Sequence, residues 1–140
     1  MFLLDTNVVS ELRKVGDGRA DARVTAWISE HDAASFYVSA LTLMELEIGI
    51  LHIEGRDSEQ GERLRGWMVR HVLPEFLERT LPVDAPIALK CARLHVPDPR
   101  SERDALIAAT AIVHGMTVVT GNRADFEATG VALINPWTAT

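Results

Sequence analysis

Residues 1–12 read MFLLDTNVVSEL, and this stretch indicates how the chain folds. The apolar run at 2–4 is typical of a short buried strand, and three polar residues, Asp5, Thr6 and Asn7, follow it directly. Thr6 or Asn7 can cap a helix that carries the second half of the stretch. The stretch therefore predicts a strand that leads into a helix, with an aspartate at the junction.

The rest of the chain repeats this alternation of apolar runs and helical segments. We expect strands at 36–38, 81–83, 117–120 and 132–134, and helices around 24–28 and over 41–52, 58–77, 84–94 and 101–114. The strands are apolar throughout, which is typical of a parallel sheet that is covered on both faces. The sequence thus predicts an α/β fold with a mostly parallel central sheet flanked by helices. The helices at 41–52 and 58–77 resemble a helical hairpin, which indicates a small helical lobe.

Length and composition restrict the class of protein. A chain of 140 residues with 47% hydrophobic content is expected to form one domain over residues 1–140. The single cysteine, Cys91, excludes a disulfide scaffold or a zinc ribbon. The N-terminal residues resemble neither a signal peptide nor a spanning helix, so we expect a cytoplasmic protein without membrane contact. The net charge of -6 argues against a general nucleic-acid coat, and any nucleic-acid contact must be local.

Two polar residues are expected at one edge of the sheet. Asp5 and Asn122 each follow the carboxyl end of a predicted strand, and ligands of parallel sheets bind beyond these ends. A purely structural role for Asp5 would be to cap the following helix. Thr6 and Asn7 compete for that role, so a functional role for Asp5 stays open beside the structural one.

Glu45 lies on a helix that is apolar on most of its circumference, and we expect this helix to be buried. Buried charges are almost never unpaired, so Glu45 requires a cation. Glu47 projects about 200° away and is expected to be solvated. The alternative to a metal partner for Glu45 is a salt bridge to an arginine.

Asp104 opens the last long helix. The spacing of Ser101 and Asp104 matches a capping box, in which the carboxylate would only bind the Ser101 amide. The small residues behind it allow close packing of this first turn against the sheet edge: Ala105, Ala108, Ala109 and Ala111. Asp104 is then brought toward Asp5 and Glu45, where the three carboxylates would repel one another unless a metal neutralised them.

The donor set of Asp5, Glu45 and Asp104 suits a hard metal ion. Three oxygen ligands without a paired-histidine motif favour Mg²⁺ or Mn²⁺ over zinc. Such an ion can activate water for in-line attack on phosphorus without a protein nucleophile. These residues therefore predict metal-dependent cleavage of a phosphodiester bond.

Several motifs in order resemble the PIN domain. They are Asp5-Thr6-Asn7 after the first strand, Ser39 with Thr42-x-x-Glu45-Leu46-x-x-Gly49, Asp104-Ala105-Leu106-Ile107-Ala108-Ala109, and Thr120-x-Asn122-x-x-Asp125-Phe126. The closing Ile134-Asn135-Pro136-Trp137 is similar to the toxin component of VapBC-type toxin–antitoxin pairs, including the FitB-like branch. This resemblance implies a PIN-like three-layer fold over residues 1–140. It also implies a Mg²⁺-dependent endoribonuclease toxin that acts on tRNA, rRNA or mRNA, forms a homodimer and is inhibited by a cognate VapB-type antitoxin.

The resemblance also implies roles for single residues. Asp5, Glu45 and Asp104 match the metal-binding acids of the family, and Thr6, Ser39 and Thr120 match its supporting polar positions. Asn122 stands where many relatives have a fourth acid; it can ligate a metal through its carbonyl oxygen but cannot act as a base. Asp125, three residues later, is the other candidate for this position, and it can equally cap the turn before Phe126.

Two other functions compete with the nuclease. An aspartyl-phosphate phosphatase would need a second aspartate two residues after Asp5, where the chain has Asn7. A PIN-fold module that only binds antitoxin or RNA stays as the alternative. RNA binding is expected near the acids from basic residues that can also be ordinary solvated charges: Arg13, Lys14, Arg100, Arg103 and Arg123. The helical lobe is a candidate surface for dimer or antitoxin contact.

Overall fold

The computed structural model describes residues 1–138 and contains a five-stranded sheet. The strands are β1 (Phe2–Leu4), β2 (Phe36–Ser39), β3 (Thr80–Leu81), β4 (Thr117–Val119) and β5 (Leu133–Ile134). Their order in the sheet is β3-β2-β1-β4-β5, and every neighbouring pair is parallel. The predicted α/β fold with a parallel sheet is confirmed. The third strand ends before Pro82, because proline has no N–H to extend the ladder.

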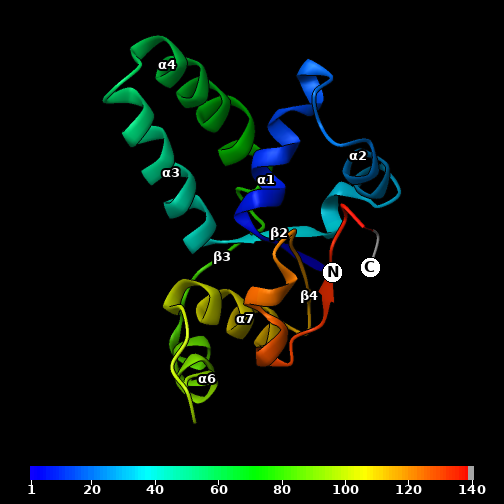
Figure 1. The fold of residues 1–140 in the computed structure, drawn as a ribbon, viewed down its shortest axis with the longest axis vertical. Helices are drawn as coiled ribbons and strands as arrows, with labels where there is room; N and C mark the ends of the chain where they lie inside the picture. The colour runs from blue at the N-terminus through cyan, green and yellow to red at the C-terminus, as the bar shows by residue number, and fades with distance from the viewer. Residues whose placement is uncertain (139–140) are drawn as a thin grey trace.

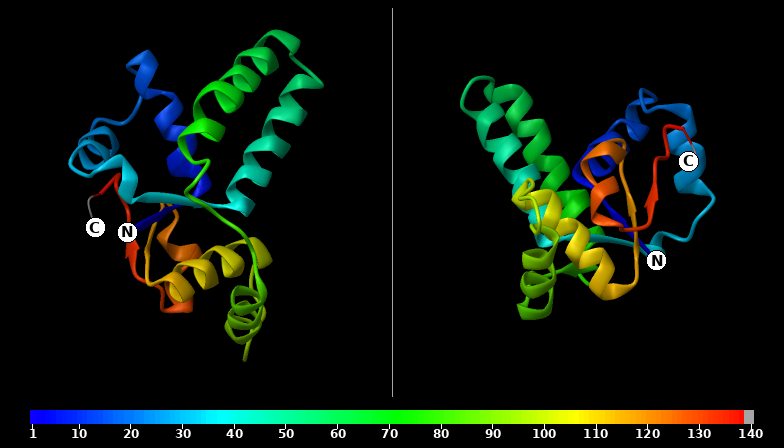
Figure 2. Two further views of the ribbon diagram at one scale, coloured as in Figure 1. Left: turned by 180° about the vertical axis from the view of Figure 1, so that it is seen from behind. Right: turned by 60° about the horizontal axis from the view of Figure 1, so that its bottom comes forward.

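Helices cover both faces of this sheet (Figure 1). On one face lie α1 (Thr6–Arg13), α2 (Ala22–Ser29), α3 (Ala40–Glu54) and α4 (Ser58–Trp67); on the other lie α6 (Ala85–Leu94) and α7 (Glu102–His114). Short 3₁₀ turns occupy Val15–Asp17, Ala33–Ser35, Arg123–Asp125 and Glu127–Thr129. The reverse and tilted views show the same three layers (Figure 2). No helix within residues 1–138 is both long and apolar enough to span a membrane.

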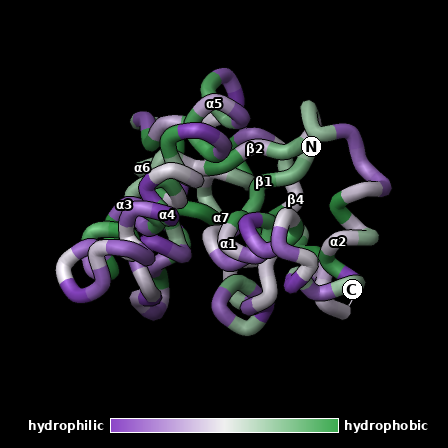
Figure 3. The backbone as a smooth tube through the Cα atoms, turned by 90° about the horizontal axis from the view of Figure 1, so that it is seen from above, coloured by the Kyte–Doolittle hydropathy of each residue, from purple (hydrophilic) through white to green (hydrophobic). Residues whose placement is uncertain are grey.

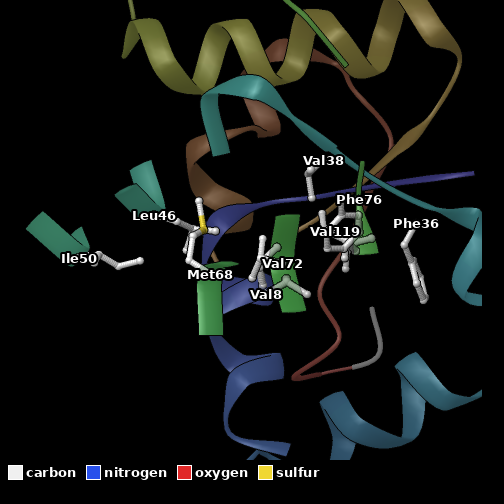
Figure 4. Packing of buried hydrophobic residues seen from close by; sticks show 11 residues of the cluster. Val8, Phe36, Val38, Leu46, Ile50, Met68, Val72, Phe76 and Val119 are labelled. Atoms are coloured by element: carbon white, nitrogen blue, oxygen red, sulfur yellow. The ribbon is translucent and has the colours of Figure 1, made fainter. Parts of the chain in front are cut away.

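The central strands β1 and β4 contribute side chains to two separate cores. Leu4 of β1 and Val119 of β4 belong to the core under α1 and α3, whereas Leu3 and Val118 belong to the core against α7. All four side chains are fully buried. Burial on both faces explains why the strands are uninterrupted apolar runs. Figure 4 shows the first core, and Figure 3 shows β1 and α7 as hydrophobic segments inside the molecule.

The contact between α6 and α7 depends on small residues. Ala105 and Ala109 pack directly against Ile87 and Cys91, and both alanines are fully buried. Cys91 is a buried member of this cluster, and burial raises the pKa of its thiol. The alanine side of α7 therefore approaches its neighbours closely, as the sequence predicts.

The helical lobe is a hairpin of α3 and α4 that projects from the body of the molecule (Figure 1). After α4 the chain continues as a π-helical turn (Met68–Val72) and a short α5 (Leu73–Glu75). The expectation of a regular helix to residue 77 was wrong. Pro74 lacks the N–H that would bind the carbonyl of Arg70, and its ring crowds that carbonyl, which favours a wider turn.

The expectation that α3 is buried was only partly correct. Its buried residues are Thr42, Leu46 and Ile50. Met44 is 39% exposed and Leu51 is 53% exposed, because the projecting lobe has no layer over this side of α3.

Candidate functional site

Asp5 lies at the carboxyl edge of the sheet, between β1 and α1, and is 7% exposed. Its Oδ1 accepts a hydrogen bond from the Thr6 amide at 2.8 Å, and its Oδ2 accepts from Thr120 Oγ1 at 2.8 Å and Asn7 Nδ2 at 3.1 Å. Asp5 is therefore the N-cap of α1, and the expected capping by Thr6 or Asn7 was wrong. Burial raises the pKa of Asp5; its hydrogen bonds oppose this shift and the charge of Glu45 adds to it.

Asn7 connects the ends of β1 and β4. Its Nδ2 also reaches Thr120 Oγ1 at 3.3 Å, and its Oδ1 accepts from the Gly121 amide at 3.0 Å. The fully buried Thr120 hydroxyl additionally accepts from the Asn122 amide at 3.0 Å. Asn7 thus holds Asp5 and the chain after β4 in one network. From the sequence we expected Asn7 only as a cap; its position two residues after a strand end was the available signal.

Glu45 reaches the same region from α3. Thr6 Oγ1 donates to Glu45 Oε1 at 3.0 Å, and the charge of Glu45 raises the pKa of Asp5. Arg103 Nη1 lies 3.8 Å from Glu45 Oε2, but the Arg103 side chain is half exposed. The expected salt bridge to an arginine therefore exists as a long, solvated contact that contributes little stability. It leaves Glu45 available to a closer cation.

Three further polar residues lie at the start of α3 or within it. Ser39 is fully buried and caps α3 by accepting from the Leu41 amide at 3.0 Å, which fixes the start of the helix that carries Glu45. Thr42 is buried within α3, and its hydroxyl has no hydrogen-bond partner within residues 1–138, so it caps no helix there. Glu47 points away from the site, as expected, but forms an ion pair with Arg65 instead of being only solvated.

Asp104 lies in the first turn of α7. Burial raises its pKa, the negative charges of Asp125 and Asp5 raise it further, and a hydrogen bond with the Ser101 side chain lowers it. Ser101 makes no side-chain capping bond at the start of α7, so the reciprocal capping box is not formed there. Asp104 is electrostatically part of the group that contains Asp5.

The two candidates for the fourth position, Asn122 and Asp125, have different surroundings. Asn122 is exposed, and its amide binds Thr120. Asp125 acts on the pKa of Asp104 more strongly than Asp5 does, and its carboxylate forms no hydrogen bond within residues 1–138. The turn at Arg123–Asp125 is closed by backbone bonds, so Asp125 has no capping role there. The charge of Asp125 therefore acts on Asp104, whereas the neutral Asn122 carries no charge that could do so.

These acids fit a hard divalent cation by their chemistry. All donors are oxygen atoms, and burial and mutual repulsion raise the pKa of both Asp5 and Asp104, which a bound cation would reverse. In the part of the chain that the structure describes, no three His, Cys, Asp or Glu side chains form a ready-made metal-binding group. Asp5 is fixed by its three hydrogen bonds, so the partly exposed side chains of Glu45 and Asp104 would have to turn toward it.

The sequence predicts five basic residues near the acids, but the structure places them differently. Arg103 faces the acids, but Arg13 and Lys14 lie at the far end of α1, about 12 Å along its axis from Asp5. Lys14 pairs with Glu11, and Arg100 Nε donates to the Leu94 carbonyl. Arg123 interacts with Glu127 and the Leu133 carbonyl.

Comparisons with known proteins agree with this geometry. Residues 2–131 match the PIN domain family. The chain is 38% identical over 144 residues to the VapC ribonuclease Y4jK of Sinorhizobium fredii, and this similarity covers 98% of each chain. It is 37% identical to the toxin FitB of Neisseria gonorrhoeae, over 98% of this chain and 99% of that one.

A solved structure is similar over the same length. The crystal structure of FitAcB from Neisseria gonorrhoeae superimposes with a TM-score of 0.87 at 34% identity, and the match covers 98% of this chain and 99% of that one. The similarity therefore includes the sheet edge and every element that carries an acid of the site.

Proposed function

Because the chain belongs to the PIN domain family and resembles its VapC and FitB toxins throughout, we propose that it hydrolyses RNA phosphodiester bonds with a divalent metal ion. It is a ribonuclease toxin that an antitoxin neutralises. The names of the relatives favour an enzyme over a module that only binds. We place its action in the cytoplasm, as a homodimer with a VapB-type antitoxin, on tRNA, rRNA or mRNA.

One observation carries the proposal. Asp5 follows β1, Glu45 lies on α3 and Asp104 lies on α7, yet Asp5 interacts electrostatically with both of the others. The raised pKa values of Asp5 and Asp104 mean that these two charges are costly for the fold, which points to a functional role. A bound Mg²⁺ or Mn²⁺ would supply an activated water and neutralise charge on the phosphate.

The residues of the chain prepare this site. Asp5 is the fixed ligand, because Thr6, Asn7 and Thr120 hold both of its oxygens. Thr6 orients Glu45 through its hydroxyl.

Asp104 is the third ligand, and Ser39 supports the site by holding the start of α3. Asp125, whose charge raises the pKa of Asp104, could accept a proton from water at the site, a role that the neutral Asn122 cannot fill as a base. This arrangement favours one firmly held ion.

The test is cleavage of a labelled RNA by purified protein in Mg²⁺ and in EDTA. Asp5→Asn, Glu45→Gln and Asp104→Asn should each lower the rate more than about 100-fold, since even outer partners of a metal matter 10- to 100-fold. Asp98→Asn, in the exposed loop before α7, is the matched control and should cleave normally. Unchanged cleavage by Asp5→Asn, or cleavage that persists in EDTA, would refute the proposal.

A further inference from the structure

A basic cavity of about 560 Å³ lies away from the acidic site. It is formed by the end of α1 and the turn after it on one side, and by α4 and the π-helical turn on the other. Figure 1 shows these segments on the same face of the sheet. The residues that matter here are Arg13, Arg19, Arg63, Arg70, Trp67 and His71.

The charge of this cavity contrasts with that of the protein. Four of the chain's 14 basic residues line it, although the net charge of the chain is -6. Asp17 is the one acid among its lining residues, and it pairs with Arg19 at 2.7 Å on the exposed surface. Four arginines with one carboxylate leave a formal charge of +3. This charge attracts anions to the cavity.

Two of these arginines have no fixed partner. Arg13 and Arg70 form no hydrogen bond or ion pair with any residue in 1–138, although the charge of Arg13 helps to lower the pKa of Asp17. Arg63 is bound to the neutral Gln60 and only distantly, at 3.9 Å, to the exposed Glu59. The guanidinium groups are therefore free to bind an external acceptor.

Gly66 gives Arg70 its position. A Cβ at residue 66 would lie 2.9 Å from Arg70 Nη1, so the guanidinium occupies the space over this glycine. Arg70 also belongs to the π-helical turn that precedes Pro74. The open space over Gly66 and the π-helical turn thus hold the Arg70 side chain against the wall of the cavity.

Trp67 adds an aromatic surface to the same cavity. It is partly buried against the core and still lines the opening. An aromatic side chain beside several arginines is the combination with which proteins bind single-stranded nucleic acid: the cations contact phosphates and the ring stacks on a base.

We propose that this cavity binds a single-stranded segment of RNA, with Arg13 and Arg70 on its phosphates and Trp67 against a base. The inference rests on the proposed ribonuclease function and adds a binding site about 12 Å along α1 from Asp5. A phosphate in this cavity holds the RNA at a distance from the cleaved bond. Such a contact contributes affinity to a protein whose net charge is -6.

The test measures binding of a short fluorescent, unstructured oligoribonucleotide to the full chain in EDTA, where cleavage is suppressed. The double variant Arg13→Ala/Arg70→Ala should bind about tenfold more weakly, and the salt dependence of log Kd should fall by about 1.4, or 0.7 for each lost phosphate contact. Arg93→Ala, an exposed arginine on α6, is the control for loss of charge and should bind normally. Gly66→Ala should weaken binding without lowering the melting temperature, because alanine favours the helix while its methyl group displaces Arg70.

The outcomes separate this inference from the proposed function. Unchanged oligonucleotide binding by the double variant overturns the inference, whereas Mg²⁺-dependent cleavage that needs Asp5 still supports the nuclease. Adenosine monophosphate that competes at the concentration of the oligonucleotide would assign the cavity to free nucleotides instead. Loss of antitoxin association together with unchanged RNA binding would assign it to the partner protein and equally contradict the RNA site.

Discussion

Asp5 combines a structural and a proposed chemical role in one side chain. One of its oxygens caps α1, and the other accepts bonds from Asn7 and Thr120. A helix cap is served equally well by aspartate, asparagine or serine, but only the charged carboxylate adds electrostatic attraction for a divalent cation. The fold therefore explains a capping residue at this position, and the proposed metal site gives a reason for aspartate over asparagine.

Thr120→Val tests the network around Asp5. The substitution keeps the volume, removes a buried hydroxyl that serves Asp5, Asn7 and the Asn122 amide, and should destabilise the fold by about 1–3 kcal/mol in urea unfolding. Thr110→Val is the matched control, because Thr110 is equally buried but binds only a helix carbonyl. Equal losses in the two variants would show that the Thr120 network has no special importance.

The raised pKa of Asp104 predicts how stability changes with pH. Because the folded chain binds this proton more tightly than the unfolded one, Asp104 contributes stability below about pH 3.8 and loses it as the pH rises through the raised value. In EDTA, Asp104→Asn should therefore be more stable than the natural chain at pH 7, and the difference should shrink toward pH 4. Urea unfolding at both pH values measures this.

Asp17→Asn is the control, because the pKa of Asp17 is shifted in the opposite direction from that of Asp104. The hydrogen bond to Arg19 lowers the pKa of Asp17, so this carboxylate stabilises the fold at neutral pH and loses that contribution in acid. Asp17→Asn should bring no gain at pH 7. A gain like that of Asp104→Asn, or no gain for Asp104→Asn, contradicts the assignment of repulsion to the acidic site.

At the scale of elements, the hairpin of α3 and α4 depends on a close approach at Gly61. A Cβ there would lie 2.6 Å from Glu54 Cγ and 2.7 Å from Glu54 Cα, and the latter is backbone that cannot move alone. Gly61→Ala should destabilise the fold by about 1–3 kcal/mol through overpacking.

Gly49→Ala is the matched substitution on α3, since no atom of residues 1–138 lies within 4 Å of the added methyl group. It should stabilise the fold by about 0.5–1 kcal/mol through helix propensity. Thermal unfolding of both variants measures the difference, and a destabilised Gly49→Ala or a neutral Gly61→Ala would contradict this account of the hairpin.

Most elements could be predicted from the sequence, because buried parallel strands are apolar runs and the helices between them have clear ends. Gly115 ends α7 in the left-handed conformation, at φ 67°, as the glycine at this position predicts. The π-helical turn and the exposed side of α3 could not be predicted. Both depend on how the lobe meets the body, which local periodicity does not encode.

Part of the candidate site, like most of the helices and strands, could be predicted from the sequence. The sequence alone indicates Asp5 and Glu45, because one follows a strand end and the other is a charged residue on an apolar helix. The network of Asn7 and the closeness of Asp125 to Asp104 depend on side-chain rotamers and on the turn after β4, so the sequence could not reveal them.

At the scale of the whole molecule, acidic and basic groups are separated. The acids gather where β1, α3 and α7 meet, and the basic cavity lies at the other end of α1. The chain returns to the same sheet edge at its end, where Asn135 Nδ2 donates to the Gly121 carbonyl. Under the two proposals above, RNA that contacted both regions would be positioned by the cavity and cut at the acids.

The most direct test of the central claim is the binding of Mn²⁺, measured by electron paramagnetic resonance on the purified protein. The natural chain and the Asp98→Asn control should each bind about one ion, because Asp5, Glu45 and Asp104 supply one set of oxygen ligands. Asp5→Asn should lose this ion while remaining folded. If Asp5→Asn bound Mn²⁺ with the same number and affinity as the natural chain, the carboxylates would not be the metal site.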